Sequence, residues 1–397
     1  MTMKVRALLV AAVMATTMWL AGCGHYVCGA GFGDTTCSSN GTGTGNQNGS
    51  ASQRAFMYFM DDKAGQMAAV GLDVDNSGTF APIANWVPPP TLTLNGSDGG
   101  MVIVNKTYLY MPYSDGNLYG YAINTTTGAL SVASTTGLNL PPFVESPIAA
   151  DPSGKFLFVG TAAGVYALSI NTTSGALSLV TGSPFASGIG QPVQMATDGA
   201  GKYLYAMDGT NISEFSYSST TGVLTSVGVL GSPMKMLAGE ISGKYMLGIT
   251  RSNGAGGTQL DNNVYVFSIG SSGALSSQPT IVSTSQTPSY IIVSPNGLLV
   301  YTFNQDDQSP TSPTEPIVGF SFSSSTGALT NPTTYSGFLS SIGKMDQTGQ
   351  YIFAVGEETN ATAAGALAIA VSGSGGLSSA LPHTGAAGST FAVTDEP

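Results

Sequence analysis

The stretch Ser-Gly-Ala-Leu-Ser at residues 174–178 contains the motif that decides the fold. A glycine, a mostly small residue and an apolar residue recur at seven places along the chain. These places are Gly78-Thr79-Phe80, Gly128-Ala129-Leu130, Gly175-Ala176-Leu177, Gly222-Val223-Leu224, Gly273-Ala274-Leu275, Gly327-Ala328-Leu329 and Gly375-Gly376-Leu377. Successive glycines are 50, 47, 47, 51, 54 and 48 residues apart. A period of about 50 residues with strand-like runs inside it is typical of one propeller blade, so the sequence predicts an all-β, seven-bladed β-propeller.

Each repeat reads as four short strands, and the third repeat shows them most clearly. Its predicted strands lie at 147–150, 155–159, 165–170 and 176–179. β-Branched and aromatic residues alternate in these runs, and Gly, Pro, Ser and Asn cluster between them, as expected for strands joined by tight turns. The glycine that ends each turn supplies the positive φ that a tight hairpin needs.

The two ends of the repeat region predict how the ring closes. Residues 54–59 match a second strand with no first strand before it, whereas residues 389–395 match a first strand with no second strand after it. We therefore expect the C-terminal strand to complete blade one, which would remove an exposed sheet edge. The predicted propeller spans residues 54–397 as one domain.

The composition indicates an exported β-protein and makes some partners unfavourable. Only 8% of the residues are charged, whereas 42% are hydrophobic, enough to form a core. The formal net charge is −11, and loss of Lys4 and Arg6 with a signal peptide would leave 9 basic against 22 acidic residues, or −13. This balance makes nucleic acid and anionic membrane surfaces poor partners. We expect a monomer.

Residues 1–22 predict a secretory signal peptide. Lys4 and Arg6 precede an apolar run from Ala7 to Leu20 that is too short for a good membrane span. The sequence then continues Leu20-Ala21-Gly22-Cys23. This resembles the bacterial lipobox and implies lipidation of Cys23 and attachment to the cell envelope, at the outer membrane or its periplasmic face. The alternative is an ordinary secretory signal with an incidental cysteine.

Residues 23–53 are rich in Gly, Ser, Thr and Asn and predict a flexible tether between the lipid anchor and the propeller. Cys28 and Cys37 lie inside this tether. In an oxidising compartment they could form a small disulfide loop, or both could stay unpaired. The only histidines are His25 and His383, so no zinc-ligand pattern is present. The acidic loops could hold a divalent cation such as Ca²⁺, but no Asp-x-Asp-x-Asp-Gly loop is present, so we expect solvated carboxylates and neither a metal nor a cofactor.

Three phrases carry a resemblance to a known family: Asp-Pro-Ser-Gly-Lys-Phe-Leu-Phe-Val at 151–159, Ser-Gly-Ala-Leu-Ser at 174–178 and Gly-Ser-Pro-Phe at 182–185. The chain resembles the seven-bladed lactonase family, typified by propeller-type 6-phosphogluconolactonase. The resemblance covers about residues 54–397 and implies hydrolysis of a sugar-type lactone. Family enzymes usually carry histidines before an inner strand, but here that stretch reads Glu145-Ser146-Pro147-Ile148. No catalytic histidine can therefore be assigned.

Lactone hydrolysis needs a base to activate water and a cation or hydrogen-bond donor for the developing oxyanion. The loops between second and third strands and the connections between blades lie on one face of a propeller, where ligands usually bind. Glu145 is the candidate base on this face, and Arg251 or Lys235 is the candidate electrophilic partner. Glu145 and Arg251 could instead be unrelated loop charges. Further candidate ligand-binding residues are Asp115, Asp208, Asp306, Asp307 and Lys344.

Two features of this face remain open to a simpler interpretation. The predicted loops at 251–261 and 304–313 are longer than the others, which marks a binding face in many repeat proteins or neutral drift in surface loops. Lys344 occupies an innermost strand, where other repeats carry Ala or Ile, so its side chain points into the central channel or lies between sheets.

The sequence therefore leads to two functions. The first is a lactonase-like hydrolase of the bacterial cell envelope, acting on a small lactone such as 6-phosphogluconolactone. The second is a non-catalytic envelope lipoprotein that binds a protein or glycan partner through its loops. The chain lacks the family histidines and contains few arginines, so its chemistry favours the non-catalytic binding function.

Overall fold

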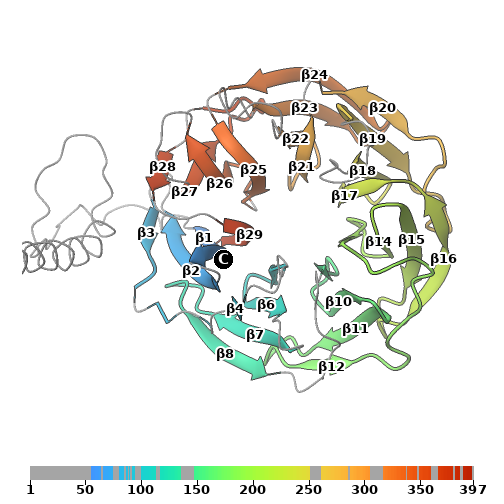
Figure 1. Cartoon of the computed structure of the whole chain (residues 1–397), viewed down its shortest axis with the longest axis horizontal. Coiled ribbons are helices and arrows are strands. Elements are labelled where there is room, and N and C mark those ends of the chain that lie inside the picture. Colours follow the sequence, from blue (N-terminus) through green and yellow to red (C-terminus); the bar gives the residue numbers. More distant parts are fainter. Residues whose placement is uncertain are drawn as a thin grey trace, which may run out of the picture.

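The computed structural model describes residues 55–63, 66–74, 80–84, 86–87, 89, 92–93, 100–112, 117–135, 147–250, 261–284, 287–304, 316–336, 338–346, 348–358, 365–378, 381–384 and 388–395. These residues form seven antiparallel sheets arranged in a ring around a common axis (Figure 1). The predicted all-β, seven-bladed propeller is confirmed. Within these ranges, no helix is long and apolar enough to cross a membrane.

The strands of the first four blades are as follows. Blade 1 contains β29 (Gly388–Asp395), β1 (Ala55–Lys63), β2 (Gln66–Val74), β3 (Phe80–Pro82) and a short β4 (Leu92–Thr93) that also pairs with β2. Blade 2 contains β5 (Val102–Val104), β6 (Tyr108–Pro112), β7 (Leu118–Ile123) and β8 (Leu130–Thr135). Blade 3 contains β9 (Ile148–Ala150), β10 (Phe156–Thr161), β11 (Gly164–Ile170) and β12 (Leu177–Leu179). Blade 4 contains β13 (Gln194–Thr197), β14 (Tyr203–Met207), β15 (Asn211–Tyr217) and β16 (Leu224–Gly231).

The remaining three blades repeat this order. Blade 5 contains β17 (Met234–Gly239), β18 (Tyr245–Thr250), β19 (Asn263–Ser268) and β20 (Thr280–Ser283). Blade 6 contains β21 (Pro288–Val293), β22 (Leu299–Asn304), β23 (Ile317–Ser323) and β24 (Ala328–Tyr335). Blade 7 contains β25 (Phe338–Met345), β26 (Tyr351–Glu358), β27 (Gly365–Ala370) and β28 (Leu381–Thr384).

The first strand of every blade faces the axis, and these seven strands contact one another in sequence around the ring. The C-terminal strand β29 is the innermost strand of blade 1 and pairs antiparallel with β1, with Ala55 opposite Asp395 and Phe59 opposite Phe391. The predicted closure is therefore confirmed. It gives the ring no free inner edge between its first and last blades.

The repeated turn glycines fit their places for two physical reasons. All six described ones have φ between +70° and +95°, a region in which a side chain is strained. Each also packs on the preceding blade: a Cβ at Gly222 would lie 2.4 Å from Cδ1 of Phe156, and one at Gly175 would lie 2.5 Å from Cδ1 of Tyr108. The same contact joins Gly128 to Phe56, Gly273 to Tyr203, Gly327 to Tyr245 and Gly375 to Leu299.

Buried tyrosines bond four of these turns to the preceding blade. Each tyrosine hydroxyl donates to the carbonyl of a turn glycine in the next blade. The pairs are Tyr58 to Gly128 (2.6 Å), Tyr110 to Gly175 (2.8 Å), Tyr205 to Gly273 (2.8 Å) and Tyr301 to Gly375 (2.9 Å). Burial raises the pKa of all four phenols, so each remains a protonated donor.

In three of these four blades, the residue opposite the tyrosine on the third strand is glycine. Gly71, Gly120 and Gly319 lie opposite Tyr58, Tyr110 and Tyr301. Where the second strand has Phe158, Leu247 or Phe353 instead, the opposite residue is Ala167, Val266 or Ala368. A Cβ at Gly120 or Gly319 would lie 2.8 Å or 2.9 Å from the tyrosine ring, so the ring needs glycine beneath it.

Blade 4 is the exception, because Tyr205 lies opposite Glu214. The Glu214 side chain is 4% exposed, and its Oε1 accepts the amide of Leu275 in blade 5 at 2.8 Å. Burial raises the pKa of Glu214, and the Leu275 amide offsets this effect only in part. A carboxyl group therefore takes part in the contact between blades 4 and 5.

Candidate functional site

The strand directions give the ring two different faces. The turns between first and second strands, at 151–155, 198–202, 240–244, 294–298 and 346–350, define the turn face. The hairpins between second and third strands, such as 161–164 and 207–211, lie at the opposite ends of the strands and define the loop face. Candidate ligand-binding residues were predicted on the loop face.

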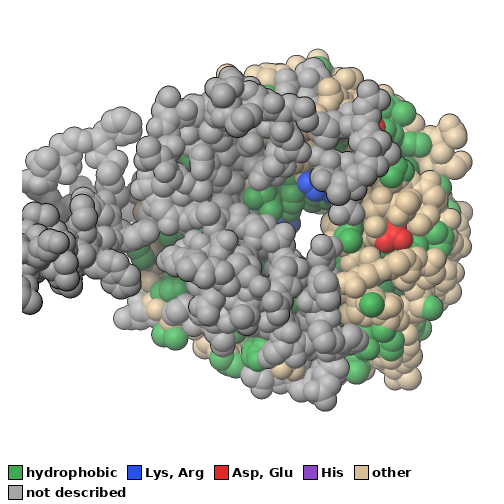
Figure 2. All heavy atoms as spheres, viewed as in Figure 1, with side chains coloured by type: hydrophobic (Ala, Val, Ile, Leu, Met, Phe, Trp, Pro, Cys, Tyr) green, Lys and Arg blue, Asp and Glu red, His purple; other side chains and the backbone are tan. Residues whose placement is uncertain are grey.

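An opening runs along the axis, and Figure 2 shows Lys or Arg side chains at its wall, over the innermost strands. Of the described residues on these strands, Lys235 in β17 and Lys344 in β25 are the cationic ones. Lys235 lies at the loop-face end of its strand, whereas Lys344 lies two residues before Asp346 of a turn on the turn face. The two lysines therefore lie at different heights along the axis.

Lys235 lies in an irregularity of its strand. Met234 pairs with Thr250 and Met236 pairs with Ile249, so Lys235 is the extra residue of a β-bulge. Bulges change the direction of a side chain and are common beside functional sites. The Lys235 side chain is half-buried.

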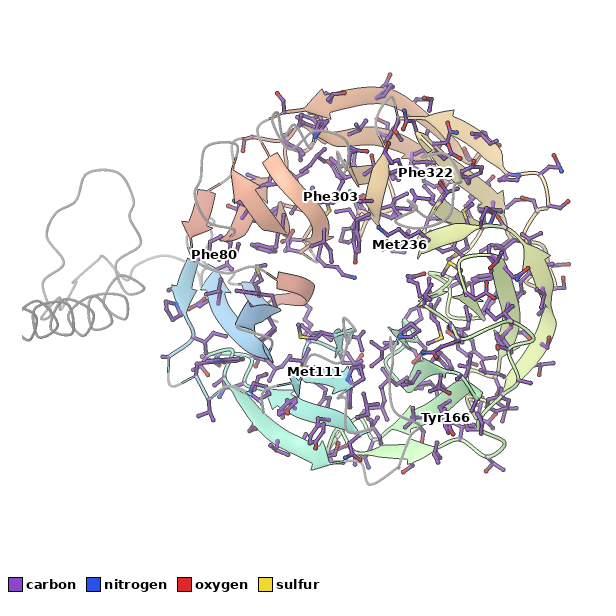
Figure 3. The ribbon with its side chains drawn as sticks, in the orientation of Figure 1. Phe80, Met111, Tyr166, Met236, Phe303 and Phe322 are labelled. Carbon is purple, nitrogen blue, oxygen red and sulfur yellow. The ribbon has the colours of Figure 1, made fainter. Side chains whose placement is uncertain are left out.

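The same bulge occurs in the next two blades. Its extra residues are Ser289 in β21 and Ser341 in β25, each three positions before the residue opposite Tyr301 or Phe353. Ser289 is buried, and its hydroxyl donates at 3.1 Å to the carbonyl of Phe303, which is labelled in Figure 3. Three successive blades thus carry a bulge at the same position, near the loop-face end of the innermost strand, a feature that the sequence pattern alone did not predict.

Gln194 fixes the innermost strand that carries Lys235. The amide N–H of Leu237 donates to its Oε1 at 3.2 Å, and its Nε2 donates to the Leu237 carbonyl at 3.4 Å. This pair of bonds joins β13 to β17 in the way that a neighbouring strand would. Because Leu237 follows Lys235 by two residues, the contact limits movement of the bulge.

Lys344 lies directly opposite Phe353 and shares its side of the sheet. Phe353 packs among residues of blade 1, and the Lys344 side chain is half-buried. The equivalent positions in other blades hold Ala149, Ala196, Ala238 and Ile292, as the sequence alignment of the repeats predicted. Lys344 therefore starts on the side of β25 that faces blade 1, with its side chain half-buried.

Asp208 has a role in the backbone of its hairpin. Its Oδ1 accepts the amides of Thr210 at 2.8 Å and Asn211 at 2.7 Å, and its Oδ2 accepts the amide of Gly190 at 3.0 Å. Burial alone would raise the pKa of Asp208, but the amides of Asn211, Thr210 and Gly190 outweigh it and lower the pKa. Such a carboxylate is ionised and held in place by local bonds.

Several predicted residues fall outside the described ranges: Glu145, Arg251, Asp115, Asp306, Asp307, Cys23, Cys28 and Cys37. The signal peptide, the tether and both long loops lie there as well, apart from Asn304 and Asp261 at their ends. The proposed grouping of Glu145 with Lys235 and Arg251 therefore stays a prediction. In the described part of the chain, no three His, Cys, Asp or Glu side chains are grouped to hold a metal ion.

The fold has counterparts among solved structures. A candidate 6-phosphogluconolactonase from Bacteroides uniformis superposes with a TM-score of 0.62 at 16% identity, covering 86% of this chain and 100% of its own. A periplasmic gluconolactonase from Pseudomonas aeruginosa gives 0.62 at 14% identity, covering 87% and 100%. A candidate 6-phosphogluconolactonase from Bacteroides fragilis gives 0.59 at 14% identity, covering 86% and 98%.

Neither a scan against protein-family models nor a search of curated protein sequences finds a match for the chain. The likeness to the three solved structures spans the described propeller from end to end, at low sequence identity. On this basis, the chain shares the seven-bladed propeller fold of these bacterial proteins.

Proposed function

We propose that the protein is a lactonase-like hydrolase that binds a sugar-type lactone at the loop-face mouth of its axis. One observation carries the proposal: Lys235 sits on a bulge of an innermost strand, beside an opening whose wall carries cationic side chains. The names of the two candidate 6-phosphogluconolactonases and of the periplasmic gluconolactonase support the substrate class.

The reaction assigns a separate task to each group. A water molecule attacks the lactone carbonyl carbon, the ring C–O bond breaks, and the departing alkoxide takes a proton to give the hydroxy acid. The Lys235 ammonium would stabilise the negative charge that develops on the carbonyl oxygen. Glu145 would accept the proton of the attacking water, and Arg251 would assist Lys235, as the sequence predicts.

Location in the bacterial cell envelope belongs to the same proposal. The lipobox-like sequence at residues 20–23 supports lipid attachment through Cys23, and one structural counterpart is periplasmic. Incorporation of labelled fatty acid into the wild-type chain, and its loss in Cys23→Ser, would test the anchor independently of activity.

A non-catalytic binding propeller is the second candidate. It is favoured by the state of Asp208, the one acidic residue predicted for the site that lies within the described ranges, since three backbone amides hold its carboxylate. No histidine lies between His25 and His383 to replace it. In that case the loop-face mouth of the axis, beside Lys235, would bind an anionic group of a glycan or protein without hydrolysing it.

A hydrolysis assay separates the two candidates. The full chain is tested on plain and 6-phosphorylated gluconolactones, with spontaneous hydrolysis subtracted. We expect turnover by the wild type, and a loss of about 100-fold or more in kcat for Lys235→Gln, the usual effect of removing an oxyanion-stabilising group. Lys202→Gln removes the same charge from the turn face and should leave kcat unchanged.

Wild-type rates equal to the spontaneous rate would contradict the hydrolase. Titration with the corresponding hydroxy acids would then test the binding candidate: binding that Lys235→Gln abolishes would support it. Equal turnover by wild type and Lys235→Gln would instead show that the site lies elsewhere.

A further inference from the structure

We propose that the turn face docks on the surface of a lipid bilayer with anionic headgroups, so that the loop face points away from the membrane. The proposal uses residues that the candidate site does not, and it depends on the lipid anchor but not on hydrolysis. Its first basis is a set of lysines that the repeat places on one side of the ring.

Lys155, Lys202 and Lys244 occupy the same position in blades 3, 4 and 5, directly before the second strand. All three are exposed. Blade 2 adds Lys106, half-buried, in its own turn between first and second strands. These four residues form the lysine arc, which brings four of the chain's eleven Lys and Arg residues to the turn face of a protein with net charge −11.

The acidic residues of the same turns are withdrawn from the surface. Asp151 is 4% exposed and Asp198 and Glu240 are fully buried. An oxygen of each accepts two backbone amides of its own turn, for example those of Lys202 and Tyr203 at 2.7 Å in the case of Asp198. The ammonium groups are therefore the outermost charges of these turns, while the carboxylates lie beneath the backbone.

Residues of both signs lie toward the loop face. Asp208 is in a loop-face hairpin, and Lys235 lies at the loop-face end of β17. In the turns of blades 3 to 5, by contrast, the exposed charged side chains are lysines, so this side of the ring is attracted to an anionic surface even when the total charge is negative.

Two exposed apolar side chains adjoin the lysine arc. Ile241 is 57% exposed and Leu298 is 56% exposed, in the equivalent turns of blades 5 and 6. The two turns touch, since a Cβ on Gly297 would lie 2.7 Å from Cγ2 of Ile241. Apolar side chains among lysines fit the boundary between headgroups and acyl chains.

The proposed lipid anchor favours a bilayer as the partner. Ala55 lies opposite Asp395 at the turn-face end of blade 1, in the position that Lys155 occupies in blade 3. The chain therefore enters the propeller on the turn face, and the proposed anchor at Cys23 lies 32 residues earlier, which is 55 minus 23. The tether permits several orientations at the membrane, and the lysine arc, on the face where the chain enters, would select one of them.

Lysine footprinting on vesicles tests the proposal. The full chain is reconstituted by its own anchor in phosphatidylcholine vesicles with or without phosphatidylglycerol. It is then treated briefly with a water-soluble acylating reagent and analysed peptide by peptide by mass spectrometry. We expect slower acylation of Lys155, Lys202 and Lys244 on the anionic vesicles, with no change at Lys235. High salt should remove the protection, because it screens exposed charges.

Matched variants separate docking from mere proximity to the membrane. Each lysine near an anionic surface contributes about 1 kcal/mol, or about fivefold in the docked fraction. Lys155→Gln/Lys244→Gln should therefore greatly reduce the protection of Lys202. Lys63→Gln, at the loop-face end of β1, removes a charge from the opposite face and should preserve it.

Equal acylation of Lys202 on the two kinds of vesicle would overturn the proposal. Equal protection of Lys235 and Lys202 would overturn it too, because the two faces would then be covered alike. The lactone assay in solution is independent of both results, so failure of docking and failure of hydrolysis can be told apart.

Discussion

The contact between turn glycines and the preceding blade gives a quantitative prediction at Gly222. This residue has φ +73°, and a Cβ would lie 2.4 Å from Cδ1 and 2.6 Å from Cε1 of Phe156. The left-handed backbone costs an alanine about 1–2 kcal/mol. Forcing a methyl group against a buried ring costs about 1–3 kcal/mol more. We therefore expect Gly222→Ala to lower the free energy of unfolding by about 2–5 kcal/mol.

Two other glycines separate these contributions. Gly201 has φ +70°, but its nearest atoms would lie 3.5 Å from a Cβ, an ordinary contact. Gly201→Ala should therefore cost only the backbone part, about 1–2 kcal/mol. Gly373 has neither a positive φ nor any atom within 4 Å of a Cβ, so Gly373→Ala should change stability by less than about 0.5 kcal/mol.

The assay is urea unfolding followed by far-ultraviolet circular dichroism, with the three variants compared through their midpoints at equal m-value. The predicted order of destabilisation is Gly222→Ala, then Gly201→Ala, then Gly373→Ala. In a Phe156→Leu background, the additional cost of Gly222→Ala should fall toward that of Gly201→Ala. If Gly222→Ala cost no more than Gly201→Ala in the native background, contact between the blades would not be what selects glycine.

Three further predictions concern buried polar groups. Tyr205→Phe should lower the free energy of unfolding by about 1–2 kcal/mol, since the Gly273 carbonyl loses its donor from blade 4; an unchanged urea midpoint would contradict this. Burial raises the pKa of Glu214 above its ordinary 4.5, so the Glu214 carboxyl keeps its proton to a higher pH in the folded state than in the unfolded state. The free energy of unfolding therefore falls as the pH rises from about 4.5 through the pKa of the folded state. Urea unfolding at several pH values should therefore show the stability of Glu214→Gln, relative to wild type, increasing with pH over this window. A difference that stays constant with pH would show that burial does not raise the pKa of Glu214. Asp151→Asn should cost about 1–3 kcal/mol in urea unfolding, because Oδ1 of Asp151 accepts two backbone amides at 2.6 and 2.7 Å and Oδ2 accepts the Ser153 amide at 3.1 Å. The NH₂ of asparagine therefore faces an N–H donor in either orientation, and an unchanged urea midpoint would contradict this.

Much of the fold could be predicted because its signals are local and repeated. Strand alternation, turn glycines and the repeat count are properties of short segments, and they gave seven blades and closure by residues 389–395 correctly. The alignment of Lys344 with Ala149 and Ala196 was also correct, since all three lie opposite the same second-strand position. The strand position of a residue such as Lys344 can therefore be predicted by aligning the repeats.

The candidate site was harder to predict because its residues depend on register and loop geometry. Asp208 reads as an exposed loop acid, yet the fold brings three backbone amides to its carboxylate, one from 18 residues earlier. Lys235 was predicted on or near the loop face, but the strand pairing makes it the extra residue of a bulge in an innermost strand. A bulge has no reliable sequence signature, because it follows from how two strands pair.

The sequence by itself determined that this chain forms a ring of seven four-stranded units, since each unit is specified by local turn and strand chemistry that recurs about every 50 residues. Only the tertiary structure decided which residues meet between blades: Tyr205 with Gly273, Glu214 with Leu275, and Gln194 with Leu237. It also decided that the lysine arc and the entry of the chain share one face while Lys235 lies toward the other. These partners are 43 to 68 residues apart, and contact at such separations is set by the closed ring rather than by any local pattern.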